Sequence, residues 1–184
     1  ERILIMIFQI SNVEYNVFLA LTMVLLATKA ILGTYLGRKI VKKKRETGEF
    51  KADFVFAIFV FMIALFVSRI IYVIFDFHLT RFDPSTYWLF PNIIYWKLGV
   101  FISGIGFSCV IFVIDKKALQ FKFKGIFAYF SVGMAILILA WPVNSSSDFA
   151  AVSFLGIIAS STGLIIPIIF IYLAAKIPGL RKPS

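Results

Sequence analysis

The stretch that decides the fold class is residues 53–75, which read DFVFAIFVFMIALFVSRIIYVIF. Its interior holds one charged residue, Arg69. A bilayer core about 30 Å thick is crossed by roughly 20 predominantly apolar helical residues, so this stretch is typical of a transmembrane helix. We therefore predict an all-α fold, in the form of a polytopic transmembrane helical bundle.

Further stretches of the same composition predict five spans in all, at residues 15–37, 53–75, 94–114, 125–141 and 149–175. Hydrophobic residues make up 61% of the 184-residue chain, well above the roughly 45–50% that is usual for soluble domains. The sequence therefore predicts a single integral membrane domain over residues 1–184, surrounded by the lipid bilayer. Residues 1–12 are too few to cross it and are expected to form an interfacial segment or a partial helix.

Basic residues gather in alternate connections, and this pattern indicates the topology. The predicted basic loops are residues 38–52 and 115–124, and the tail after residue 175 is also basic. Lysine and arginine in short loops stay on the cytoplasmic side, so the N-terminus is predicted outside and the C-terminus in the cytoplasm. Trp88, Trp96 and Trp141 all fall on the predicted outer side, as an aromatic belt requires. We expect the chain to lie in the cell (plasma) membrane.

The remaining composition excludes several function classes. The net charge of +10 is explained by the membrane topology, so no nucleic acid is expected as a partner. One cysteine and one histidine cannot build a Cys or His metal cluster, and neither a metal nor a cofactor is expected. The predicted spans hold no carboxylate in their interiors, which argues against proton-coupled transport and against paired-carboxylate catalysis. Because motifs for phosphate binding and nucleophilic catalysis are also missing from the sequence, we expect no enzymatic activity.

Charged side chains inside a span are costly unless they are paired or hydrated, and Arg69 and Lys29 are of this kind. Arg69 shares a helix face with Asp76, and its guanidinium can also reach toward Glu14 or Asp148 on neighbouring helices. This pattern allows either a structural ion pair or an anion contact. Lys29 lies roughly 13 Å from the cytoplasmic end of its span, a distance that its long side chain can partly recover.

The predicted outer loop, residues 76–93, is rich in aromatic residues. Together with the start of the next span it supplies Arg81, Tyr87, Trp88 and Trp96. Amphipathic aromatic side chains beside an arginine suit recognition, so these residues are candidates for a binding platform on the outer face. The simpler alternative is that the aromatic rings anchor the loop among lipid headgroups.

Small residues recur at four-residue spacing, which lets membrane helices approach closely. The candidate packing pairs are Gly33 with Gly37, Gly104 with Ser108, and Gly156 with Ser160. Most of these rows are expected to serve packing within the bundle. One row left over would allow a homo-oligomer or a place in a larger membrane complex.

Four consecutive basic residues follow the first span: Lys42, Lys43, Lys44 and Arg45. A cluster of this kind beside a membrane helix is a candidate site for anionic lipid headgroups, in addition to setting the topology.

These patterns favour a small non-enzymatic membrane protein that acts as an accessory, assembly or sensory-input subunit through helix packing and its outer aromatic loop. The alternative is an oligomeric small channel or transporter, in which Arg69 and the Ser/Thr-rich fifth helix line the path. A membrane-bound enzyme ranks third.

Overall fold

The computed structural model describes residues 12–49, 53–117, 119–164, 168 and 171. This part of the chain is helical and contains no strand, which confirms the predicted all-α class. The α-helices are α2 (Asn12–Thr47), α3 (Phe54–Val73), α4 (Asn92–Lys117), α5 (Ile126–Ala140) and α6 (Ser146–Ser161). Three short helical segments complete the fold: the π-helical η1 (Ile74–Leu79) and the 3₁₀ segments η2 (Pro84–Thr86) and η3 (Thr162–Leu164).

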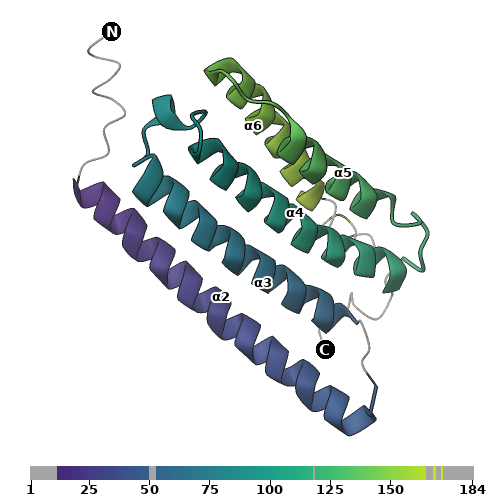
Figure 1. The fold of residues 1–184 in the computed structure, drawn as a ribbon. Helices are drawn as coiled ribbons and strands as arrows, with labels where there is room; N and C mark the ends of the chain where they lie inside the picture. Colours follow the sequence, from purple (N-terminus) through teal and green to yellow (C-terminus); the bar gives the residue numbers. More distant parts are fainter. Residues whose placement is uncertain (1–11, 50–52, 118, 165–167, 169–170, 172–184) are drawn as a thin grey trace.

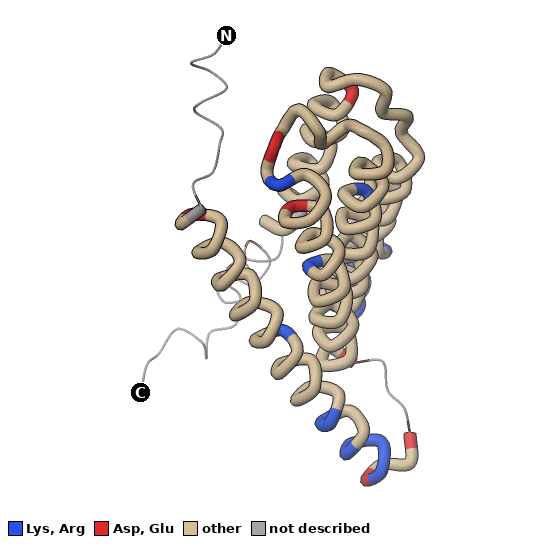
Figure 2. The backbone as a smooth tube through the Cα atoms, turned by 60° about the vertical axis from the view of Figure 1, so that its left-hand side comes forward, with Lys and Arg blue, Asp and Glu red and all other residues tan. Residues whose placement is uncertain are grey.

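Consecutive helices pack against one another in chain order (Figure 1). The α3–α4 pair forms the most extensive interface, with Ala57 of α3 packed against Val110 and Ile114 of α4. Helix α2 packs chiefly on α3 and so lies at one edge of the bundle, whereas α5 joins α4 to α6. In Figure 2, α2 is inclined to the other helices, and basic residues gather near its C-terminal end.

In the described part of the chain, three helices are long and apolar enough to cross a membrane: α2, the continuous α3–η1 helix, and α4. Helices α5 and α6 are apolar but shorter. The 15 residues of α5 reach about 22 Å, less than a bilayer core of about 30 Å. Most of the predicted span beyond residue 164 lies outside the described residues.

The structure corrects the predicted basic loop at residues 38–52, because α2 continues as far as Thr47. Lysine, arginine and glutamate are good helix formers, and Lys42 and Glu46 add an i,i+4 ion pair at 3.8 Å. The helix ends where Gly48 adopts a positive φ of 70° and its amide donates to the Lys44 carbonyl. The basic cluster therefore lies on a rigid helical extension.

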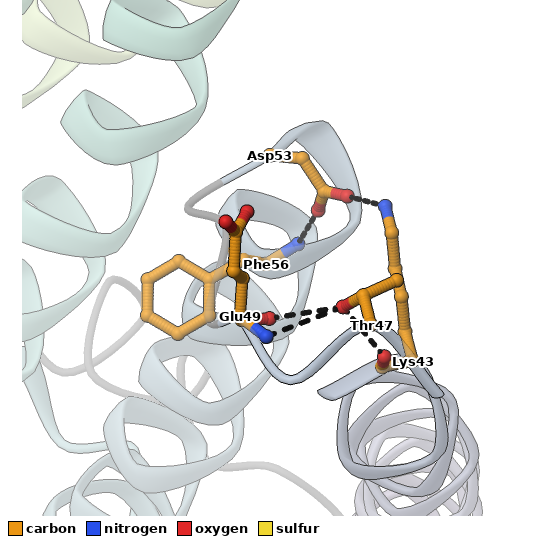
Figure 3. A network of polar contacts seen from close by, with 5 residues as sticks. All are labelled: Lys43, Thr47, Glu49, Asp53 and Phe56. Carbon is orange, nitrogen blue, oxygen red and sulfur yellow. Dashed lines mark hydrogen bonds and ion pairs between the residues drawn. The ribbon is translucent and has the colours of Figure 1, made fainter. Parts of the chain in front are cut away.

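The turn from α2 to α3 is held by a small polar network (Figure 3). The Asp53 carboxylate caps α3 by accepting from the Phe56 amide at 3.1 Å, and it also accepts from the Lys43 ammonium at 2.5 Å. The Lys43 hydrogen bond is the main reason that the pKa of Asp53 lies below its ordinary value. The first contact caps α3, and the contact with Lys43 ties the start of α3 to the end of α2.

The second predicted basic loop, residues 115–124, is also corrected, because α4 continues to Lys117. The turn that follows bends back onto Asp115, whose buried carboxylate accepts from the amides of Phe123 at 3.1 Å and Gly125 at 2.6 Å. Gly125 has a φ of 76°, a conformation that glycine adopts without strain. Asp115 thus anchors the connection from α4 to α5.

The predicted outer loop, residues 76–93, is shorter than expected at both ends. The π-helical segment carries the chain to Leu79, where the Thr80 amide and hydroxyl both donate to the Phe75 carbonyl. Asp83 then accepts from the Ser85 amide, and α4 begins at Asn92. The loop proper is therefore confined to residues 80–91.

Candidate functional site

The polar contacts between α2 and α3 form the first candidate site. The Arg69 guanidinium of α3 donates to the hydroxyl of Thr22 in α2 at 2.7 Å, and Thr22 is only 2% exposed. The Nε of Arg69 is buried and has no hydrogen-bond partner among the described residues. A neighbouring serine, Ser68, turns the opposite way and donates to the Gly99 carbonyl of α4 at 2.8 Å. Adjacent residues of α3 thus connect to the helices on either side.

Lys29 is the second basic side chain of this site. It is half-buried on α2 and lies within electrostatic range of Arg69. Lys29 is about 26 Å from either end of the 36-residue helix at about 1.5 Å per residue, so it occupies the middle of α2. The chain has no aspartate or glutamate between residues 15 and 45 or between residues 54 and 75. Two cations therefore lie within electrostatic range of one another, with no carboxylate at their own level in the two helices that carry them.

Two of the three predicted acidic partners, Asp76 and Glu14, lie nearer the ends of these helices, and the third, Asp148, lies in the first turn of α6 and accepts from the Asn144 amide at 3.0 Å. Asp76 is half-buried in η1 and within electrostatic range of Arg69, but these two described residues form no hydrogen-bonded ion pair. Glu14 lies in the first turn of α2. The hydroxyl of Thr22 thus occupies the position that the sequence led us to expect for a carboxylate.

Ring contacts join the helices at the end of the bundle that carries η1. Tyr15 of α2 packs edge-on against Phe77, with centroids 5.2 Å apart, and donates from its hydroxyl to the Phe77 carbonyl at 3.2 Å. On the other side, Phe149 of α6 contacts the rings of Tyr87 and Trp96, at 5.8 and 5.2 Å respectively. These contacts place Tyr87 and Trp96 between elements of the chain.

The other residues of the predicted outer platform differ in exposure. Arg81 is exposed, with a positive φ of 49°, and Trp88 is half-buried. Burial, with Asp76 and Asp83 nearby, raises the pKa of the Tyr87 hydroxyl above its ordinary value. The platform residues are thus not equivalent, because Arg81 is exposed whereas Tyr87 and Trp96 are occupied by contacts within the chain.

The small residues lie in three different places. Gly33 and Gly37 face α3, where an added Cβ would lie 3.3 Å from Ile63 and 3.2 Å from Phe59. Gly104 faces Ala135 of α5. The hydroxyls of Ser108 and Ser160 donate to the carbonyls one turn earlier, at Gly104 and Gly156 respectively.

The closest helix approaches occur at glycines outside these three pairs. A methyl group on Gly106 would overlap with Ala64 of α3, and one on Gly99 would lie 2.8 Å from the Tyr72 ring. Gly106 belongs to none of these predicted four-residue pairs, although it lies on the same helix as Gly104 and Ser108. The α3–α4 interface therefore depends on Gly99 and Gly106.

A cleft of about 250 Å³ opens between α4, α5 and α6, and Phe61 and Leu65 of α3 also line it. Three serines, Ser103, Ser131 and Ser160, contribute to its wall, together with apolar side chains such as Phe107 and Ile138. Arg69 does not line this cleft, because it lies on the side of α3 that contacts α2. The predicted pairing of Arg69 with the Ser/Thr-rich helix in one path thus does not occur among the described residues.

The basic cluster after the first span is divided between two surfaces. Lys42 and Arg45 line a groove between α2 and α3, and Lys43 and Lys44 face the turn that carries Asp53. The described part of the chain contains no group of three or more His, Cys, Asp or Glu residues that could hold a metal ion. No protein-family model matches the sequence, and no curated protein or solved structure is significantly similar to it.

Proposed function

We propose that the chain is a small non-enzymatic integral membrane protein that acts as an accessory or assembly subunit, with α2 as its docking helix. The partner is a transmembrane helix that carries a carboxylate near the level of Lys29. The observation behind the proposal is that two cations, Lys29 and Arg69, lie within electrostatic range of one another with no acidic residue at their own level in α2 or α3.

The position of α2 supports this proposal. This helix packs chiefly on α3, so most of its surface remains uncovered by the rest of the described chain. Leu25, one turn before Lys29, is 49% exposed. A charged group in a span is stabilised when an opposite charge or a polar cavity lies beside it. A second copy of this chain has no carboxylate in the interior of its predicted spans, so the proposed complement comes from a different protein.

The proposal includes the membrane arrangement expected from the sequence. Five spans place the N-terminus outside and the C-terminus in the cytoplasm, with the basic end of α2 on the cytoplasmic side of the cell membrane. Single cysteines at Lys44, Ser85 and Lys182 in a Cys109→Ala background would test it with an impermeant maleimide on intact cells. Labelling is expected at Ser85→Cys only. Labelling of Lys44→Cys or Lys182→Cys on intact cells would contradict this topology.

The partner is tested by a photo-reactive amino acid at Leu25, with Ile157 of α6 as the matched control because it is also exposed, at 66%. The expected adduct joins Leu25 to a membrane protein whose span contains Asp or Glu. It should be lost in Lys29→Leu, kept in Lys29→Arg, and lost when the partner carboxylate is changed to its amide. An adduct that survives Lys29→Leu, or one also obtained from Ile157, would count against the proposal.

A second candidate function is a small channel or transporter that is completed by oligomer formation. It is favoured by the serine-bearing cleft between α4, α5 and α6. Solute flux across liposomes that contain the purified chain would test it, with Ser131→Ala as the variant because Ser131 is buried at this cleft. Flux that depends on Ser131 would favour transport over the accessory function.

A further inference from the structure

The groove between α2 and α3 joins an apolar channel to a row of cations. Its volume is about 730 Å³. The apolar part is bordered by Gly33 and Gly37 on α2 and by Phe59, Ile63 and Phe66 on α3. Ile63 and Phe59 pack close to these glycines, which carry no side chain, and together they form the apolar floor of the groove. An apolar chain of lipid dimensions can therefore lie along it.

The cationic end of the groove lies on α2, directly after Gly37. Arg38, Lys42 and Arg45 all line it. Their i, i+4 and i+7 spacing places them on one face of α2, over about 10 Å at about 1.5 Å per residue. All three residues are exposed. The row is thus rigid, helical and directed along the groove.

The other cations near the end of α2 are more nearly neutralised. Lys43 donates to Asp53 at 2.5 Å, and Lys39 and Lys44 line a small cleft with the same aspartate. On the groove face, Lys42 contacts Glu46 at 3.8 Å, but both side chains are largely exposed and such a pair contributes little. The excess positive charge therefore lies on the groove.

We propose that this groove is a binding site for one anionic glycerophospholipid of the surrounding bilayer. Its phosphate lies between Arg38, Lys42 and Arg45, and one acyl chain runs along Gly33 and Gly37. Charge complementarity selects the anionic headgroup, and the apolar channel distinguishes a lipid from a free phosphate ion. The site uses neither Lys29 nor Arg69, so it does not depend on the proposed partner, and it requires no particular orientation in the membrane.

The test uses the full chain in phosphatidylcholine bilayers with spin-labelled phosphatidylglycerol as the probe, read by electron paramagnetic resonance. We expect a motionally restricted phosphatidylglycerol population that spin-labelled phosphatidylcholine does not show and that excess inorganic phosphate does not displace. The triple variant Arg38→Gln, Lys42→Gln, Arg45→Gln should weaken the selectivity by roughly fivefold per residue, the factor that about 1 kcal/mol for a basic group near an anionic surface gives.

The matched charge control is the triple variant Lys116→Gln, Lys117→Gln, Lys122→Gln, which removes three exposed cations from the other basic connection. It should retain the selectivity. A second pair of variants tests the channel. Thr34→Phe fills the groove, whereas Ile31→Phe places the same ring on α2 outside the groove. Only Thr34→Phe should reduce the restricted population. If the basic triple fails to fold, Arg45→Gln alone, at the exposed end of α2, should show the single-residue effect.

Three outcomes would overturn the proposal. An equal loss of phosphatidylglycerol selectivity in both triple variants would mean that the total basic charge attracts the lipid and that the groove plays no part. If Thr34→Phe retained the restricted phosphatidylglycerol population, no acyl chain would occupy the channel. Displacement by inorganic phosphate would show an anion site without a lipid component.

Discussion

The guanidinium of Arg69 and the hydroxyl of Thr22 meet at 2.7 Å and connect α3 to α2. Thr22 is the one buried polar residue on the described part of α2, and Arg69 also has a buried Nε with no partner among the described residues. A charged donor away from water is costly when its hydrogen bonds are unmade. The Thr22 hydroxyl therefore supports a side chain that is already incompletely satisfied.

Thr22→Val should destabilise the bundle because it leaves Arg69 with one acceptor fewer at nearly constant side-chain volume. We expect a loss of about 1.5–3 kcal/mol in the free energy of unfolding, the range for a hydrogen bond to a charged group. Denaturation of the purified chain in mixed micelles, followed by circular dichroism, measures this value. Thr22→Ser should retain most of the stability because it keeps the hydroxyl.

Thr28→Val is the matched control for this prediction. Thr28 lies on the same helix, is exposed, and donates to its own Val24 carbonyl at 2.9 Å. Its loss should change the free energy of unfolding by less than about 0.5 kcal/mol, as for most surface substitutions. Equal effects of Thr22→Val and Thr28→Val would show that the contact with Arg69 contributes no stability.

Asp115→Asn should loosen the connection between α4 and α5. The carboxylate accepts from two backbone amides through separate oxygens, whereas an amide side chain offers one acceptor oxygen. We expect a loss of about 1–3 kcal/mol in the free energy of unfolding because a buried amide is left without its acceptor. Lys116→Gln, at the exposed neighbouring residue, is the control and should be near neutral. A neutral Asp115→Asn would mean that the turn is held by its backbone bonds.

The Asp53 contacts predict an acid-sensitive end of the bundle. The hydrogen bond from Lys43 lowers the pKa of the folded carboxyl below its ordinary 3.8, so the carboxylate contributes stability above that pH. This contribution is lost as the pH falls below 3.8 and passes through the folded value. The thermal midpoint should therefore fall less steeply on acidification in Asp53→Asn than in the parent chain, over the range below 3.8. Parallel pH profiles of the two chains would contradict this linkage.

The helical class and the positions of the longest spans could be predicted from the sequence because a membrane-crossing helix needs a long apolar segment. The helix ends could not be predicted in the same way. Charged residues after Gly37 mark the edge of the apolar segment, but they are good helix formers, and α2 continues to Thr47 before Gly48 ends it. Apolarity and helicity thus end at different residues.

The partners of the candidate residues were harder to predict. We considered carboxylates as partners for Arg69, whereas the structure brings it to a hydroxyl 47 residues away. Close packing was expected at Gly104 with Ser108, yet the tightest approach to α3 occurs at Gly106. When a helix is apolar on all sides, the sequence does not indicate which face meets its neighbour. Helix rotation, and with it the choice between Gly104 and Gly106, depends on the packing of the whole bundle.

Gly106→Ala should be the most disruptive of the single-methyl substitutions, and Gly133→Ala is its matched control. Both glycines lie within helices, but a Cβ on Gly106 overlaps with Ala64 whereas a Cβ on Gly133 meets nothing within 4 Å. Alanine is the better helix former by about 1 kcal/mol, so Gly133→Ala should stabilise the chain slightly. Gly106→Ala should cost about 1–3 kcal/mol because α3 and α4 must separate to admit the methyl group. Unfolding of both variants in mixed micelles measures the difference, and a Gly106→Ala variant as stable as Gly133→Ala would show that α3 and α4 do not approach at this point.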